Sequence, residues 1–145
     1  MVSYADTGII VSSYLPYEGA SDKARRIIEK TPRPVILSLL TLLEVRNALN
    51  GAISRHEISE EDRDTIFADI DRQFAAGFFR MADVSQVEIY AKARELSDRH
   101  TQSFMTRSLD LMHVATALLV KAHFFLSTDT RQRKAAKAEG MEVRP

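Results

Sequence analysis

The stretch RSLDLMHVATALLVKAHFFLSTD, residues 107–129, carries the clearest indication of the fold class of this chain. Its apolar residues recur at helical spacing, which predicts a helix that begins near Arg107 or Ser108 and ends near Ala122. The apolar residues that come next predict a short strand over 123–127. A helix that runs directly into a short buried strand is typical of α/β proteins with a parallel sheet.

The same alternation extends over the rest of the chain. Apolar runs predict four further strands, at 2–5, 35–37, 78–82 and 141–143. Helices are predicted at 21–30, at 39–55, from 59 to a stop at Gly77, from a capping box at 85–88 towards His100, and at 130–139 before Gly140. We therefore expect a single α/β domain over residues 1–145, a three-layer sandwich in which helices flank a mostly parallel sheet.

One region departs from this alternation. Residues 38–76 place two helices in succession, separated only by a short break at 56–58. Without a strand between them, the two helices can leave the sheet together. This pattern favours a helical pair that projects from the sheet as an arm.

Composition narrows the class of protein. The chain has no Cys and no signal-peptide pattern at its start, so we expect a cytoplasmic protein without disulfides. Its apolar runs are shorter than the roughly 20 residues of a membrane span, so no membrane association is expected. The net charge is zero, but residues 1–90 carry −4 and residues 91–145 carry +4. The basic run Arg131, Arg133, Lys134 and Lys137 is either a solvated helix face or part of a nucleic-acid surface.

Four acidic residues are the candidates for chemistry. Asp6 and Asp129 each follow a predicted strand, and Glu44 and Asp110 lie in predicted helices. Because ligands of parallel sheets bind outside the carboxyl ends of the strands, we expect these acids to meet at one edge. Clustered carboxylates repel one another, and hard cations such as Mg²⁺ or Mn²⁺ offset that repulsion. Two such ions can bracket a phosphate and activate a water molecule for attack on it. The sequence motifs of phosphate loops, dinucleotide sites, nucleophile elbows and zinc proteases are absent.

Each of these residues also has a structural interpretation. Asp6, in a predicted turn or helix start, and Asp129 are natural helix caps. Asp110 lies three residues after Arg107, a spacing that permits a surface ion pair. His113 more often packs and hydrogen-bonds than binds a ligand. The apolar neighbours of Glu44 predict partial burial, which requires a partner for its charge.

Four segments together resemble the PIN-domain nucleases, and within them the VapC-type ribonuclease toxins of toxin–antitoxin pairs. These segments are Asp6-Thr7 after the first strand, TLLEVRNAL at 41–49, RSLDLMHVATA at 107–117, and LSTD at 126–129 followed by RQR. The third is the most specific. Gly8 departs from the Ser or Asn that many relatives carry at this position.

The resemblance implies a sheet of order 3-2-1-4-5 and a Mg²⁺- or Mn²⁺-dependent endoribonuclease that cleaves RNA through metal-activated water. It implies that Asp6, Glu44, Asp110 and Asp129 are the catalytic, metal-binding acids. A cognate antitoxin and a homodimer are the implied protein partners. Residues proposed to orient the acids or to bind RNA are Thr7, Thr128, Arg107, Arg131 and Arg133.

Three alternatives to the toxin interpretation remain open on the sequence alone. A PIN-like nuclease of RNA maturation would use the same acids on another RNA. A metal-dependent phosphatase would use them on a phosphomonoester. A non-catalytic binding module would keep the acids only as helix caps.

Overall fold

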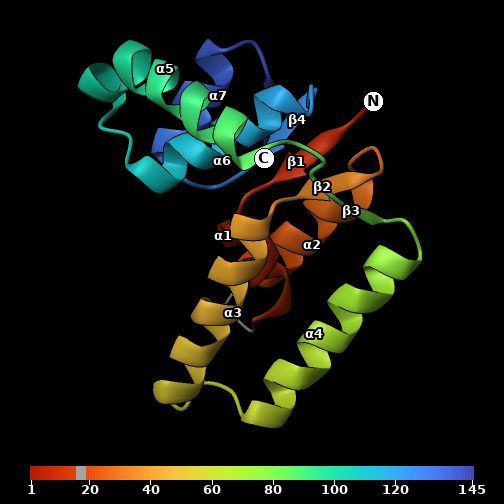
Figure 1. The fold of residues 1–145 in the computed structure, drawn as a ribbon. Coiled ribbons are helices and arrows are strands. Elements are labelled where there is room, and N and C mark those ends of the chain that lie inside the picture. The colour runs from red at the N-terminus through yellow and green to blue at the C-terminus, as the bar shows by residue number, and fades with distance from the viewer. Residues whose placement is uncertain (16–18) are drawn as a thin grey trace.

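A computed structural model describes residues 1–15 and 19–145. In these residues the strands form one five-stranded sheet, parallel throughout, in the order β3-β2-β1-β4-β5 (Figure 1). This confirms the predicted fold class and strand order. The elements are β1 (Ser3–Ala5), α1 (Thr7–Tyr14), α2 (Ala20–Lys30), β2 (Val35–Leu37), α3 (Leu39–Ser54), α4 (Glu60–Ala75), β3 (Phe79–Met81), α5 (Gln86–Phe104), α6 (Ser108–Leu119), β4 (Phe124–Leu126), α7 (Thr130–Ala138) and β5 (Glu142–Arg144).

The three central strands are buried on both faces. Tyr4, Ile36 and Phe125 are neighbours in register and pack against α5, α6 and α7. The residues that alternate with them, such as Ala5 and Leu37, face the other way and pack against α1 to α4. Because helices cover both faces, these strands appear in the sequence as continuous apolar runs rather than as alternating ones.

Most element boundaries lie within one or two residues of the prediction, and the larger differences have local causes. The turn or helix start expected at Asp6 opens a full helix, α1. Helix α6 ends at Leu119 instead of near Ala122, because Lys121 adopts a left-handed conformation with φ of 57°. The capping box predicted at Ser85 is wrong, since that side chain makes no capping hydrogen bond. Pro16 and Gly19 also predict a break between elements at 15–20, a segment that lies partly outside the described residues.

Helices α3 and α4 form the expected arm. They lie side by side and extend away from the sheet (Figure 1). The guanidinium carbon of Arg46 lies 4.0 Å from the ring centre of Phe67, and Arg63 Nη1 donates to Asn50 Oδ1 over 2.9 Å. No helix among the described residues is both long and apolar enough to cross a membrane.

A polar contact joins α5 to α7 on the other face of the sheet. Glu139 accepts a hydrogen bond of 2.8 Å from His100 Nε2 and a second from Arg99. Burial pushes the pKa of Glu139 up, but these two hydrogen bonds outweigh burial and leave the pKa below its ordinary value. The charged form of Glu139 therefore stabilises the packing of α7, the helix that begins at Asp129.

We predict that Glu139→Gln lowers the free energy of unfolding at pH 7 by about 1.5 kcal/mol, the low end for a hydrogen bond to a charged group because Arg99 is half exposed. A carboxylate with a lowered folded pKa contributes stability above its unfolded pKa of about 4.3 and loses it as the pH falls through the folded value. Urea unfolding of both proteins from pH 7 to pH 3 measures the difference. A gap that stays constant over this range would contradict the assignment.

Candidate functional site

A cavity of about 570 Å³ lies at the carboxyl edge of the sheet. Its walls come from the starts of α1, α6 and α7 and from the first turns of α3. All four acids predicted from the sequence line it: Asp6, Glu44, Asp110 and Asp129. The edge of the sheet therefore brings together residues that are up to 123 positions apart in the chain.

Asp6 is almost fully buried at the end of β1. Its Oδ1 accepts from the backbone N–H of Ile9, which caps α1, and its Oδ2 accepts from Ser127 Oγ over 2.5 Å. Burial raises the pKa of Asp6 despite these two hydrogen bonds. These two hydrogen bonds therefore compensate the buried charge of Asp6 only in part.

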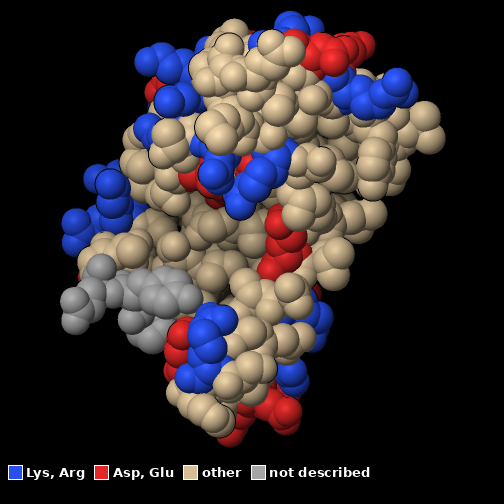
Figure 2. All heavy atoms as spheres, turned by 90° about the vertical axis from the view of Figure 1, so that its left-hand side faces the viewer, with Lys and Arg blue, Asp and Glu red and all other residues tan. Residues whose placement is uncertain are grey.

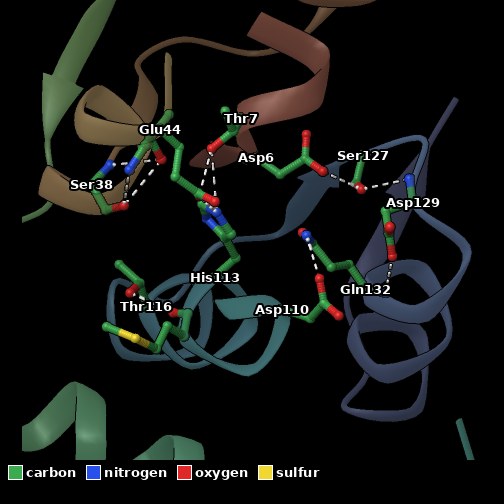
Figure 3. A network of polar contacts seen from close by, with 12 residues as sticks. Asp6, Thr7, Ser38, Glu44, Asp110, His113, Thr116, Ser127, Asp129 and Gln132 are labelled. Carbon is green, nitrogen blue, oxygen red and sulfur yellow. Dashed lines mark hydrogen bonds and ion pairs between the residues drawn. The ribbon is translucent and has the colours of Figure 1, made fainter. Parts of the chain in front are cut away.

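Asp129 lies opposite Asp6, across Ser127. Its backbone N–H donates to Ser127 Oγ over 3.0 Å, so one hydroxyl group links the two acids (Figure 3). Asp129 Oδ1 accepts from the N–H groups of Arg131 and Gln132, at 2.9 and 3.0 Å, and thereby caps α7. Its Oδ2 lies 3.5 Å from Arg107 Nη2.

Asp110 is held by a salt bridge. Its Oδ2 accepts from the backbone N–H and the Nε of Arg107, at 2.9 and 3.0 Å, and its Oδ1 accepts from Arg107 Nη2 and from Gln132 Nε2, at 3.2 and 3.1 Å. Burial pushes the pKa of Asp110 up, but the bonds from Arg107 and Gln132 outweigh it, and the pKa lies below its ordinary value. The Arg107 side chain is 63% exposed and bridges Asp110 to Asp129.

Glu44 reaches the cavity from α3 and is held by two neighbours. Its Oε1 accepts from Thr7 Oγ1 over 2.8 Å and from His113 Nε2 over 2.6 Å. Burial raises the pKa of Glu44, but these hydrogen bonds outweigh it and keep the pKa below its ordinary value. The expected role of Thr7 as an orienting residue agrees with this contact.

His113 is fixed from behind by a buried tyrosine. Its Nδ1 lies 2.7 Å from the hydroxyl of Tyr4, which also contacts Ser38 Oγ at 3.1 Å. Nε2 faces the carboxylate of Glu44 and donates to it, while the Tyr4 hydroxyl beside Nδ1 donates its proton in a hydrogen bond to Ser38 Oγ. Burial raises the pKa of Tyr4, so the phenol keeps this proton. His113 therefore connects the sheet core to Glu44.

These residues fit a hard divalent cation in their chemistry, since four carboxylates from four elements face one cavity. Their present arrangement is not a finished coordination sphere. No group of three or more His, Asp or Glu side chains within residues 1–15 and 19–145 is close enough to hold a metal ion. The guanidinium of Arg107 instead supplies the positive charge between two of the acids.

The predicted auxiliary residues separate into two groups. Thr7, Thr128 and Arg107 line the cavity. Arg133 does not, because it donates to the carbonyl oxygens of Ser127 and Pro145, at 2.9 and 3.0 Å, and Arg131 is also outside the lining. On the face shown in Figure 2, acidic side chains lie next to Lys and Arg rather than in one continuous acidic patch.

Sequence reasoning missed several residues that hold the acids directly or support the groups around them. They are Tyr4, Ser38, Thr41, Ser127 and Gln132. Ser127 had a usable signal, because it ends a predicted strand two residues before Asp129. Tyr4 and Gln132 had none, since a Tyr in an apolar strand and a Gln in a basic helix are ordinary.

The PIN domain family model matches residues 3–138. No curated protein matches the chain significantly. Among solved structures, the chain is similar to VapC20 of Mycobacterium tuberculosis, a Sarcin-Ricin loop cleaving toxin, with 19% identity, full coverage of both chains and a TM-score of 0.71. It is also similar to FitAcB from Neisseria gonorrhoeae, with 19% identity, coverage of 100% and 97%, and a TM-score of 0.66. A toxin–antitoxin complex from Klebsiella pneumoniae matches with 20% identity, coverage of 99% and 96%, and a TM-score of 0.64.

We predict that Tyr4→Phe lowers the free energy of unfolding by about 1–3 kcal/mol, because it leaves the buried Nδ1 of His113 and Oγ of Ser38 without the hydroxyl that both contact. The change is measured as a shift of the urea midpoint at constant slope. Tyr90→Phe, at a 59% exposed position on α5, is the matched control and should change stability by less than about 0.5 kcal/mol. Equal stability of the two variants would show that the Tyr4 hydroxyl contributes nothing.

Proposed function

Because the chain belongs to the PIN domain family, we propose that it is a metal-dependent endoribonuclease, the toxin of a toxin–antitoxin pair. The observation that carries this proposal is the convergence of Asp6, Glu44, Asp110 and Asp129 on one cavity. The similarity in fold to solved toxins of toxin–antitoxin systems supports it.

The four acids would hold Mg²⁺ or Mn²⁺. When bound, the cation would lower the pKa of a coordinated water and neutralise charge on the scissile phosphate. Ser127 fixes Asp6, and Thr7 and His113 fix Glu44, so both acids are oriented before any ligand arrives. Orientation in advance is useful because partners that hold metal-binding carboxylates influence metal affinity.

Arg107 is the residue that must change partners in this mechanism. It occupies the space between Asp110 and Asp129, and its side chain is free on the solvent side. A cation that binds these acids would release the guanidinium, which is suited to bidentate contact with a phosphate. Arg107 would then bind the RNA backbone at the edge of the cavity, with Arg131 as a further contact.

The proposed substrate is RNA and the proposed protein partner is a cognate antitoxin. The solved neighbours support this choice, since one is a Sarcin-Ricin loop cleaving toxin and another a toxin–antitoxin complex. Exposed apolar side chains on α3 and α5, namely Leu39, Leu43, Val87 and Tyr90, are available for a second copy in a homodimer. We further propose that the chain acts in the cytoplasm as one domain.

A non-catalytic binding module is the second candidate, and a specific observation favours it. Asp6, Asp110 and Asp129 each accept hydrogen bonds from backbone N–H groups at a helix start, as capping residues do. Capping does not account for Glu44, which lies inside α3 and reaches across to α6. A nuclease of RNA maturation and a metal-dependent phosphatase would use the same four acids as the toxin. Parallel assays of RNA and of a generic phosphomonoester distinguish a nuclease from a phosphatase.

Metal binding separates the nuclease from the binding module. We predict that Mn²⁺ or Mg²⁺ raises the melting temperature, because a ligand at 100 times its Kd stabilises the folded state by about 2.7 kcal/mol. Thermal melts with and without chelator measure the shift. Asp110→Asn should remove most of it. A wild-type melting temperature that is indifferent to both metals would instead support the binding module.

We predict that Asp6→Asn abolishes metal-dependent RNA cleavage while the metal-free protein stays folded. Burial disfavours the charge of Asp6, and Asn caps a helix about as well as Asp, so the variant should be at least as stable as the wild type at pH 7. Cleavage of a labelled RNA and a thermal melt in chelator are the two measurements. Asp98→Asn, an exposed change on α5, is the control and should cleave normally. Normal cleavage by Asp6→Asn would falsify the assignment.

A further inference from the structure

Gln132, in the first turn of α7, lines the cavity and carries a buried polar atom without a hydrogen-bond partner. The residue is 7% exposed, and its Nε2 donates to Asp110 Oδ1 over 3.1 Å. Among the buried side-chain nitrogen and oxygen atoms of the described residues, its Oε1 is the one without a hydrogen-bond partner. Figure 3 shows the amide of Gln132 between Asp6 and Asp110.

The orientation of this amide follows from its neighbour. If oxygen and nitrogen were exchanged, Oε1 would face the carboxylate oxygen of Asp110, and two acceptors would meet without a proton. The Nε2 therefore belongs next to Asp110. The oxygen that remains is an acceptor in a cavity lined by four acids.

An acceptor in this position requires a donor or a cation. Buried polar side-chain atoms in folded proteins nearly always have a partner, so an orphaned one calls for a specific explanation. The cationic side chain that lines the cavity, Arg107, is already engaged by Asp110 and Asp129. The carboxylates that surround the amide are themselves acceptors, and thus do not satisfy it.

We propose that Gln132 is a fifth oxygen ligand of the metal centre, with Oε1 binding the hydrated divalent cation that the four acids attract. Hard cations take amide carbonyl oxygens together with carboxylates and water, so the group is of the right chemical class. This inference rests on the proposed function, since it requires that the acids hold a metal. It assigns Gln132 two roles, as an anchor for Asp110 through Nε2 and as a ligand through Oε1.

Two substitutions separate these roles. Gln132→Met removes both the donor and the acceptor at similar size, while Gln132→Glu removes the donor to Asp110 and keeps an oxygen at the acceptor position. Titration of each metal-free protein with Mn²⁺ alone, followed by calorimetry and by thermal melts, gives the affinities. Gln102→Met, at an exposed position on α5, is the matched control.

We expect Gln132→Met to weaken Mn²⁺ binding by about 10–100-fold, as is usual when a group near a bound metal is lost. Its metal-free melting temperature should change little, because the orphaned acceptor is removed along with the hydrogen bond to Asp110. Gln132→Glu should bind Mn²⁺ at least as tightly as the wild type. Gln102→Met should match the wild type in both measurements.

Two outcomes would overturn the inference. If Gln132→Met binds Mn²⁺ with the affinity of the wild type, the amide of Gln132 is not a ligand of the metal. Equal weakening in Gln132→Met and Gln132→Glu means that Gln132 acts only through its donor to Asp110. If Gln132→Met does not fold, the same comparison of Mn²⁺ affinities is made between Gln132→Leu and Gln132→Glu. Absence of Mn²⁺ binding to the wild type contradicts the proposed metal dependence itself, and is therefore distinguishable from failure at Gln132.

Discussion

Mutual repulsion among four carboxylates is the constraint on which the architecture of this site depends. A parallel sheet brings the acids together because its strands end at one edge, but like charges in a half-buried cavity need compensation. The compensation here comes from many small sources. Helix-start N–H groups face Asp6 and Asp129, hydroxyl groups face Asp6 and Glu44, and the guanidinium of Arg107 faces Asp110. The protein's own groups thus hold the acids in position.

The sheet core contributes to the site through Tyr4. This β1 side chain is fully buried between the sheet and the helices that cover it, stacks on Phe125 with ring centres 5.7 Å apart, and has its hydroxyl against His113. Packing therefore fixes the ring, the ring fixes the imidazole, and the imidazole fixes Glu44. Such a chain of contacts couples the geometry of the cavity to the packing of the sheet core.

How far the sequence predicted the structure depends on the range of the interactions. The strands and most helices follow from local periodicity, and the four acids follow from their places after strands and within amphipathic helices. Gly77 and Gly140 end α4 and α7 as predicted, because both adopt positive φ. What failed depends on contacts between distant residues or on one side-chain rotamer. The Ser85 capping box matched a pattern but not a rotamer, and neither the bridge from Arg107 to Asp129 nor the pairing of Tyr4 with His113 has a local signal.

Asp110 and Asp6 differ in how well the protein compensates their charges. Asp110 is satisfied by Arg107 and Gln132, whereas Asp6 keeps a raised pKa and a buried charge. Under the proposed function, a divalent cation would compete with one guanidinium for Asp110 and relieve the penalty at Asp6. The first effect weakens metal binding and the second strengthens it. Gln132 lies between these two acids, so under the same proposal its free oxygen would strengthen metal binding.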